Sequence, residues 1–245
     1  MSCNLLLRGG PTHDFDATSD LLAAVFAEQG IPTVMLDEPA DLFAALCSGE
    51  VDGAPVTAVT VDALRWRMDQ HRYATQRDRW AVDPADDDLA TVERFVRSGG
   101  GMLAVHTAVI CFDAHPRWTG LCGAAWNWDR SSHPPPGPVT VEVTECGRTH
   151  PVTAGSGGFE VHDELYGDLD LIEGLTPLMV GRVGAVAAPQ PVLWAQELDA
   201  GRVVTDLLGH GPESLTHPGH RVVLTGAVRW VCRAGAPATH GGGVT

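Results

Sequence analysis

The chain has 245 residues and a formal net charge of -15, and a chain of this length is commonly a single domain. The negative charge would repel the phosphates of nucleic acids and anionic lipids, which argues against both as partners. All sixteen basic residues are arginines, so a lysine Schiff base with pyridoxal phosphate and a P-loop nucleotide site are excluded. We therefore expect a small neutral ligand, with neither a nucleotide cofactor nor pyridoxal phosphate.

The sequence contains no apolar run near the roughly 20 residues that span a bilayer. The first residues lack the basic region and long apolar run of a signal peptide. We therefore expect a cytoplasmic protein. The six cysteines contain no CxxC pair, which argues against a zinc ribbon or a dithiol redox site.

The first sixty residues alternate between predicted strands and helices. Short apolar runs predict strands at residues 3–8, 31–36 and 55–61. Apolar residues on one face, followed by glycine, predict helices at 16–30 and 41–48. Such alternation is typical of a parallel sheet covered by helices.

Residues 65–84 interrupt this alternation with many arginines and several aromatic residues. We interpret the segment as an insertion. It is either a lid whose tryptophans reach a ligand, or a solvated helical arm or dimer contact.

The alternation resumes with a predicted helix at 86–97, whose first turn is acidic and whose last turn is basic, as the helix dipole favours. Glycines 99–101 end that helix, and the apolar strand 102–105 leads directly to His106. Right-handed crossovers would build a parallel sheet with helices on both faces and ligands at the carboxyl ends of its strands. We expect His106 at that edge.

The second half of the chain has an antiparallel pattern. Alternating residues predict a strand at 139–143, and 191–197 is expected to pair with 201–208 across a short turn. A last helix begins near Pro218 and ends near Arg233. Residues 1–233 are therefore predicted to form one domain, and 234–245 a disordered tail.

Three motifs together resemble those of the ThuA-like, or trehalose-utilisation, family. They are GGGMLAVHTA at 99–108, FEVHDELY at 159–166 and LGHGPES at 208–214, followed by a helix that contains Arg229 and Trp230. The resemblance implies a flavodoxin-like three-layer sandwich of the class I glutamine amidotransferase type. Its central sheet would be mostly parallel, with an antiparallel extension. The resemblance also implies a role in carbohydrate metabolism.

In amidotransferases a nucleophilic cysteine follows this strand, and here its position is taken by His106. An imidazole does not readily replace a thiol in thioester chemistry, because nucleophile and base are separate groups in that mechanism. We therefore predict that the protein is not a glutaminase. His210 resembles the triad histidine, but Glu213 lies one residue further along than the usual His-x-Glu pair.

Three histidines, His13, His106 and His210, each follow a predicted strand, so they are expected to converge at one sheet edge with Asp163 or Glu164 nearby. Such a set suits a divalent metal such as zinc, and it equally suits metal-free acid and base catalysis. We predict His106, His210 and Glu164 as catalytic residues. The candidate metal ligands are His13, His106 and His210.

The predicted substrate contacts combine histidines, carboxylates and tryptophans. Trp126 and Trp128 offer flat faces on which sugar rings stack, although tryptophans also fill cores and subunit contacts. Asp163 and Glu164 are adjacent, so their side chains are expected to point in different directions. The full set of predicted substrate contacts is His13, Trp126, Trp128, His133, Asp163 and Glu213.

Two functions follow from these residues. The first is an enzyme that acts on a sugar or keto-sugar by hydrolysis, elimination or isomerisation. The second is a non-catalytic sugar-binding or regulatory module that keeps the fold without the nucleophilic cysteine. A third function, that of a structural interaction protein, for example as a homo-oligomer, is suggested only by residues 65–84 and the tryptophans.

Overall fold

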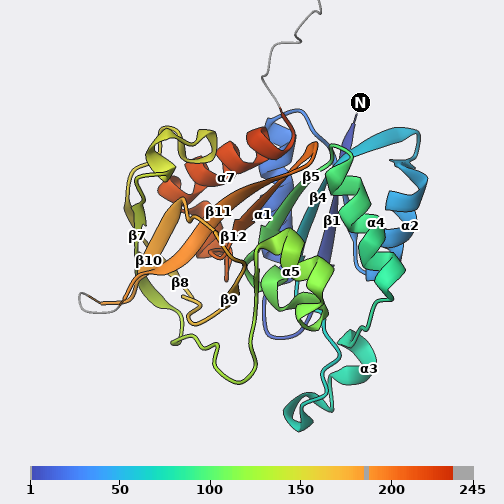
Figure 1. Cartoon of the computed structure of the whole chain (residues 1–245), viewed down its shortest axis with the longest axis horizontal. Helices are drawn as coiled ribbons and strands as arrows, with labels where there is room; N and C mark the ends of the chain where they lie inside the picture. Colours follow the sequence, from blue (N-terminus) through green and yellow to red (C-terminus); the bar gives the residue numbers. More distant parts are fainter. Residues whose placement is uncertain (1, 185–187, 234–245) are drawn as a thin grey trace, which may run out of the picture.

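The computed structural model describes residues 2–184 and 188–233, and the predicted tail lies outside these ranges. One large sheet runs through the molecule (Figure 1). Three short strands lie outside the main order of this sheet: β3 (Glu50–Val51) pairs with β4, and β6 (Ala124–Ala125) pairs separately with β9 (Asp170–Leu171). The sheet order is β2 (Thr33–Leu36), β1 (Cys3–Gly9), β4 (Ala54–Ala63), β5 (Gly101–Val105), β12 (Gly201–Asp206), β11 (Gln190–Leu198), β10 (Met179–Arg182), β7 (Gly137–Val143) and β8 (Phe159–Asp163).

The sheet changes character at β12. Neighbouring strands from β2 to β12 are parallel, whereas those from β12 to β8 are antiparallel. The predicted parallel sheet with an antiparallel extension is therefore confirmed. The carboxyl ends of β1, β4, β5 and β12 consequently lie at one edge.

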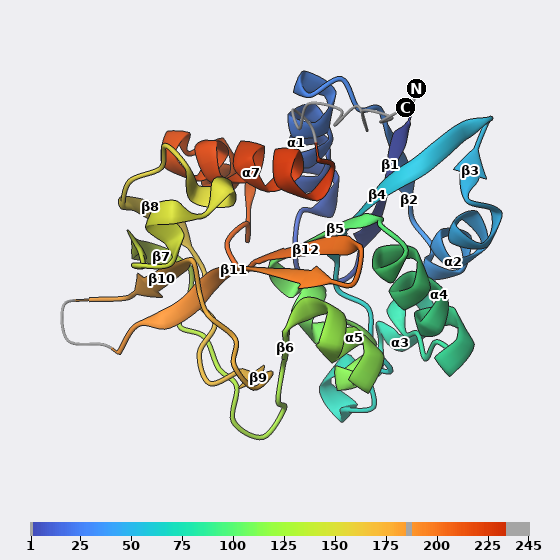
Figure 2. The same cartoon turned by 45° about the horizontal axis from the view of Figure 1, so that its top comes forward.

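Helices cover both faces of the sheet. Helices α1 (Phe15–Glu28) and α7 (Pro218–Val231) lie together on one side, and α4 (Asp86–Arg97) and α5 (Pro116–Cys122) lie on the other (Figure 2). Helix α2 (Pro39–Ser48) packs beside α4.

Each face of the sheet has its own apolar core, because side chains alternate along a strand. On β5, Met102 and Ala104 join the core beneath α2, α4 and α5, while Leu103 and Val105 join the core beneath α1 and α7. All four side chains are fully buried. Burying an aliphatic side chain of this size contributes about 1.5–3 kcal/mol, so the continuous apolar run of β5 fixes this strand between the two helix layers.

The segment at 65–84 contains a 3-10 helix, η1 (His71–Tyr73), and the short helix α3 (Arg77–Trp80). It extends from the end of the molecule where β4 ends (Figure 1). Its first residues are not solvated, since Arg65, Trp66 and Met68 are buried. The segment therefore begins inside the body of the protein.

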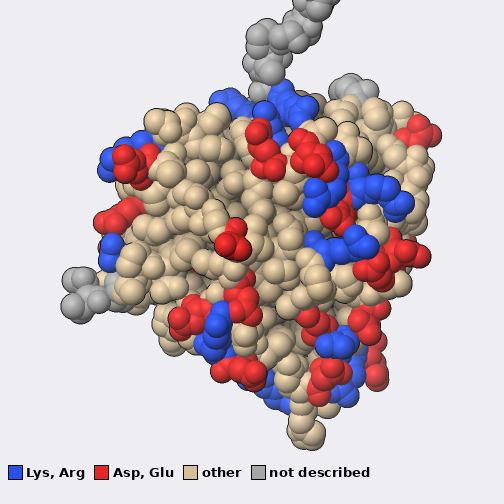
Figure 3. Space-filling model, viewed as in Figure 1, with Lys and Arg blue, Asp and Glu red and all other residues tan. Residues whose placement is uncertain are grey.

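The surface carries intermixed charges. In the view of Figure 3, arginine and acidic side chains are interspersed rather than separated into areas of one sign. Within the described ranges, no helix is both long and apolar enough to cross a membrane.

Candidate active site

His106 occupies a strained position at the end of β5, where the 3-10 helix η2 (His106–Ala114) begins. Its φ is +47°, which is uncommon for a bulky residue and costs about 1–3 kcal/mol. The side chain is only 2% exposed. Nδ1 lies 2.8 Å from the carbonyl oxygen of Leu207 and therefore donates to it. This bond leaves Nε2 to face Glu164 Oε2 at 3.5 Å and Tyr166 Oη at 3.1 Å.

His210 is held by the backbone that follows β12. Asp163 Oδ2 accepts from the N–H of Gly209 at 2.8 Å, and Asp163 Oδ1 accepts from the N–H groups of His210 at 3.1 Å and Glu164 at 2.7 Å. Gly209 has a φ of +110°, which favours glycine at this turn. The buried Asp163 carboxylate thus fixes the loop that presents the His210 imidazole.

His13 approaches the same point from the loop after β1. Its ring centre lies 5.3 Å from that of His106 and 4.7 Å from that of His210. Its Nε2 is buried without a hydrogen-bond partner among the described residues. The structure thus brings together the three histidines that the sequence places at strand ends.

Glu164 lies between the histidines. Its Oε2 is 3.5 Å from both His106 Nε2 and His210 Nδ1, and its Oε1 is 2.7 Å from His133 Nδ1. Burial alone would raise the pKa of this carboxyl, but the neighbouring imidazoles of His106 and His210 hold it well below its usual range. Glu164 is therefore ionised at neutral pH.

The histidines differ in their affinity for a proton. Burial would lower the pKa of His106, but the neighbouring carboxylates of Glu164 and Asp163 raise it above its usual value. Burial, together with the nearby imidazoles of His106 and His210, lowers the pKa of His13 to about 3. The environment of the site therefore favours a proton on His106 over a proton on His13.

A cavity of about 630 Å³ lies beside these groups, and His106 itself is buried below it and does not line it. Four of its lining residues, His13, His133, Glu164 and His210, belong to this cluster. Of the predicted substrate contacts, Asp163 and Glu213 do not line the cavity: Asp163 is buried below it, and Glu213 is exposed in the first turn of α6 (Pro212–Thr216). The other lining residues are Thr12, Leu64, Trp66, Arg72, Tyr73, Ile110, Trp126, Trp128, Ser131, Ser132, Pro136 and Tyr166.

Three of these aromatic residues are absent from the predicted site. Tyr166 stacks on His106 with ring centres 4.6 Å apart, and its position two residues after Glu164 is the signal that would have found it. Trp66 and Tyr73 come from the segment at 65–84, and the ring of Trp66 lies 5.6 Å from that of Trp128. For these two residues, the sequence signal is the high density of aromatic residues in that segment.

Cys111 does not supply an alternative nucleophile. Its thiol is fully buried and donates to the carbonyl oxygen of Ala63 at 3.2 Å. Burial raises its pKa to about 12, so a thiolate does not form near neutral pH.

The cluster has the donor set of a divalent metal site. One ligand atom from each of His13, His106, Glu164 and His210 lies within 4.8 Å of the others. In a tetrahedral zinc site, with Zn–N distances of 2.0–2.1 Å, ligand atoms lie about 3.4 Å apart. His13 Nε2 and His210 Nδ1 are buried without hydrogen-bond partners among the described residues, which fits atoms that await an ion or a ligand.

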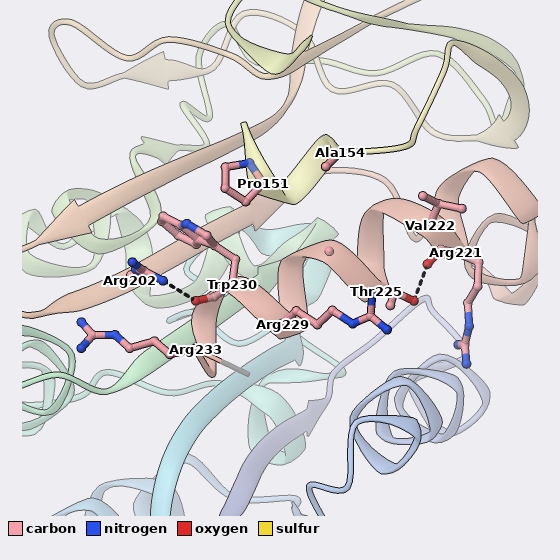
Figure 4. A pocket seen from close by; sticks show the side chains of 10 residues that line it. Pro151, Ala154, Arg202, Arg221, Val222, Thr225, Arg229, Trp230 and Arg233 are labelled. Carbon is pink, nitrogen blue, oxygen red and sulfur yellow. Dashed lines mark hydrogen bonds between the residues drawn. The ribbon is translucent and has the colours of Figure 1, made fainter. Parts of the chain in front are cut away.

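A second cavity, of about 600 Å³, lies against α7 and the 3-10 helix η4 (Pro151–Thr153) (Figure 4). All four of its arginines are bonded to the protein. Arg202 stacks on Trp230 and donates to its carbonyl oxygen, and Arg221 pairs with Glu28. Arg229 donates to Gln29, and Arg233 donates to the carbonyl oxygen of Ala200. Neither a histidine nor a carboxylate lines this cavity among the described residues. We therefore place the candidate active site at the histidine cluster.

Solved structures of similar fold include two ThuA-like proteins. One, described as a putative ThuA-like protein from Parabacteroides merdae, has a TM-score of 0.71 and 15% identity over 94% of this chain and 90% of that chain. Its counterpart from Bacteroides uniformis has a TM-score of 0.65 and 15% identity over 94% and 91%. A β-galactosidase from Rahnella sp. R3 has a TM-score of 0.60 and 12% identity. That match covers 96% of this chain but only 32% of the β-galactosidase chain.

Sequence comparison gives the family directly. No curated protein matches the sequence. A family model described as ThuA, trehalose utilisation, matches residues 75–231, which include His106, Glu164 and His210. Since this match covers well over half of the 245 residues, the chain belongs to the ThuA, or trehalose-utilisation, family.

Proposed function

We propose that the protein is an enzyme that acts on a sugar or keto-sugar, with His106, His210 and Glu164 as its catalytic residues. The convergence of these groups with His13 at one end of an aromatic-lined cavity carries the proposal. The cavity volume of about 630 Å³ lies within the roughly 300–1,000 Å³ of small-molecule sites. Aromatic faces such as those of Trp126 and Trp128 stack on the apolar faces of sugar rings.

Hydrolysis, elimination and isomerisation each require one proton to be removed and another to be delivered. The raised pKa of His106 favours its Nε2 as the proton donor, whereas the lowered pKa values of His13 and Glu164 favour them as acceptors. Titratable groups whose pKa values are pushed apart in one site are the usual acid and base of an enzyme. His210, held by Asp163, would orient the reacting hydroxyl or carbonyl group.

A form of the site that holds a divalent ion such as Zn²⁺ is a further part of the proposal. His13, His106 and His210 would hold the ion, with His106 Nε2 then an unprotonated ligand instead of a proton donor, and Glu164 lies close enough to serve as a fourth ligand. When bound, such an ion polarises a carbonyl or hydroxyl oxygen. Neither a nucleotide nor pyridoxal phosphate is proposed.

We also propose the flavodoxin-like layering of class I glutamine amidotransferases for this fold. The support is a parallel set of strands with helices over both faces and the histidines at the carboxyl ends. A cytoplasmic location, a sugar-like ligand rather than nucleic acid or membrane, and a homo-oligomer belong to the same proposal.

A non-catalytic sugar-binding module is the second candidate. The near-complete burial of His106 beneath the stacked ring of Tyr166 favours it, because a reacting group must reach its substrate.

One experiment separates the two candidates. Purified protein is examined by elemental analysis and is then incubated with a panel of disaccharides and their 3-keto forms, with products detected by mass spectrometry. The enzyme predicts a new product from at least one sugar, and its metal form predicts about one divalent ion per chain. Sugar binding with neither metal nor product would overturn the enzyme in favour of the module.

A further inference from the structure

We infer that the end of the cavity away from the histidines is an aglycone subsite for a flat aromatic group. This inference rests on the proposed function, in which the histidine end holds the sugar. It names the substrate class as an aromatic glycoside, or its keto form, rather than a second sugar ring joined to the first.

A continuous series of aromatic rings connects the two ends of the site. Ring centres are 4.6 Å apart for His106 and Tyr166, 5.2 Å for Tyr166 and Trp126, and 6.2 Å for Trp126 and Trp128. Trp66 then lies 5.6 Å from Trp128. The series runs from the candidate catalytic groups to the segment at 65–84, so aromatic side chains form the wall of the far end.

The far end combines residues from two parts of the chain. Trp66 and Tyr73, whose rings meet edge to face at 4.8 Å, precede residue 75, where the family match begins, whereas Trp128 lies inside the match. The guanidinium of Arg72 covers the ring of Tyr73 at 4.8 Å and that of Trp128 at 5.8 Å. The segment at 65–84 and the loop after β6 therefore build the far end together.

Outside the histidine cluster and Tyr166, the polar side chains that line the cavity are Thr12, Arg72, Tyr73, Ser131 and Ser132, and among the described lining residues there is no amide. The guanidinium of Arg72 is stacked on the rings of Tyr73 and Trp128. The hydroxyl of Ser131 is already engaged, because it donates to the carbonyl of Asp168 and accepts from the N–H of Asn127. Each sugar hydroxyl buried without a partner lowers affinity about tenfold. A flat apolar ring incurs no such penalty and gains stacking on the wall.

Trp126 marks the boundary between the two ends. It contacts the rings of Tyr166 on one side and Trp128 on the other. Its Nε1 is buried without a hydrogen-bond partner among the described residues. An N–H donor at this place suits the glycosidic oxygen that joins the sugar to its aglycone.

The test compares three kinds of probe by isothermal titration calorimetry: phenyl glucosides, methyl glucosides and trehalose, the glucosides in both anomers and in 3-keto form. We expect a phenyl glucoside to bind at least tenfold more tightly than the matching methyl glucoside, and trehalose to bind no more tightly than methyl glucoside. In the Tyr73→Leu variant, the phenyl preference should fall to about twofold while methyl glucoside affinity is retained.

Trp80→Leu is the matched control, since Trp80 lies in the same segment but does not line the cavity; it should keep the phenyl preference. Thermal melting confirms that each variant is folded. Equal binding of phenyl and methyl glucosides, or tighter binding of trehalose, would overturn the aglycone subsite and leave the proposed function standing. Binding of no glucoside or disaccharide by the wild-type protein would overturn both.

Discussion

Two adjacent carboxylates, Asp163 and Glu164, have different tasks. Asp163 is buried and accepts three backbone N–H groups, whereas Glu164 faces the cavity and three imidazoles. The sequence predicts that the two side chains diverge, because adjacent residues in an extended segment point to opposite sides. It does not reveal which one is structural, because the N–H donors of Gly209 and His210 lie more than forty residues away in the sequence.

Replacing Asp163 by asparagine should therefore destabilise the protein. The amide has one acceptor oxygen, so at least one buried N–H loses its partner, which costs about 1–3 kcal/mol. Urea unfolding at pH 7.5 measures the change, with Glu160→Gln as the control because Glu160 is exposed on the same strand. Equal stability of the Asp163→Asn and control variants would show that Asp163 does not hold the loop.

Asp62, at the end of β4, is a second buried carboxylate near the site. It accepts hydrogen bonds from the hydroxyls of Thr18 and Ser19, yet burial raises its pKa to about 6. A carboxyl whose pKa is raised on folding binds more protons when folded, so its ionisation destabilises the protein as pH rises from about 4 to 6.

Asp62→Asn keeps an acceptor for both hydroxyls and removes this titration. The variant should be about 2 kcal/mol more stable than the wild type at pH 7.5, and the gain should disappear near pH 4. Urea unfolding at the two pH values measures it. A variant that is less stable than the wild type at both pH values would show that ionisation of Asp62 does not destabilise the folded protein.

At the scale of elements, a buried pair joins α7 to the end of β12. His220 Nε2 lies 2.9 Å from Asp206 Oδ2, and Asp206 Oδ1 accepts from the N–H of Leu208. On its other side, His220 Nδ1 faces the hydroxyl and carbonyl oxygens of Ser214 at 3.0 Å. Burial would lower the pKa of His220, but Asp206 and the more distant Asp163 raise it. The pair therefore links the last helix to the strand end that carries Leu207 and His210.

The stability that this pair contributes is complete below the usual histidine pKa of about 6.5 and is lost as pH rises through the higher pKa of the folded state. His220→Gln should cost about 3 kcal/mol at pH 6, because it leaves a buried carboxylate unpaired, and less at pH 9. Urea unfolding of His220→Gln, Asp206→Asn and the double variant measures the coupling. If the losses in unfolding free energy of the two single variants add up in the double variant and do not change with pH, His220 and Asp206 do not stabilise each other.

The elements that the sequence predicts are those with a strong local pattern. The acidic start and apolar stripe of α4 and the apolar run of β5 predict their bounds to within a residue. The two-residue strands β6 and β9 have no such pattern, because each forms only against a partner far away in the sequence. Likewise, the bend at His106 depends on bonds to Leu207 and Tyr166.

At the scale of the whole molecule, topology explains why the histidines meet. His13, His106 and His210 follow β1, β5 and β12, whose carboxyl ends share one edge. This convergence was predictable from the sequence, because ligand-binding residues in parallel sheets lie at the carboxyl ends of the strands. The cavity wall was not predictable, because Trp66 meets Trp128 only when the segment at 65–84 folds against the loop after β6.

The central claim is that His106 and His210 act on a sugar, and one measurement tests it most directly. It compares turnover of a responsive sugar by wild-type protein, by the His106→Ala, His210→Ala double variant, and by His162→Ala, whose side chain is exposed on β8. We expect the double variant to lose at least about 100-fold in rate, the usual contribution of acid–base groups, and the control to match wild type. Unchanged turnover in a folded double variant would contradict the account.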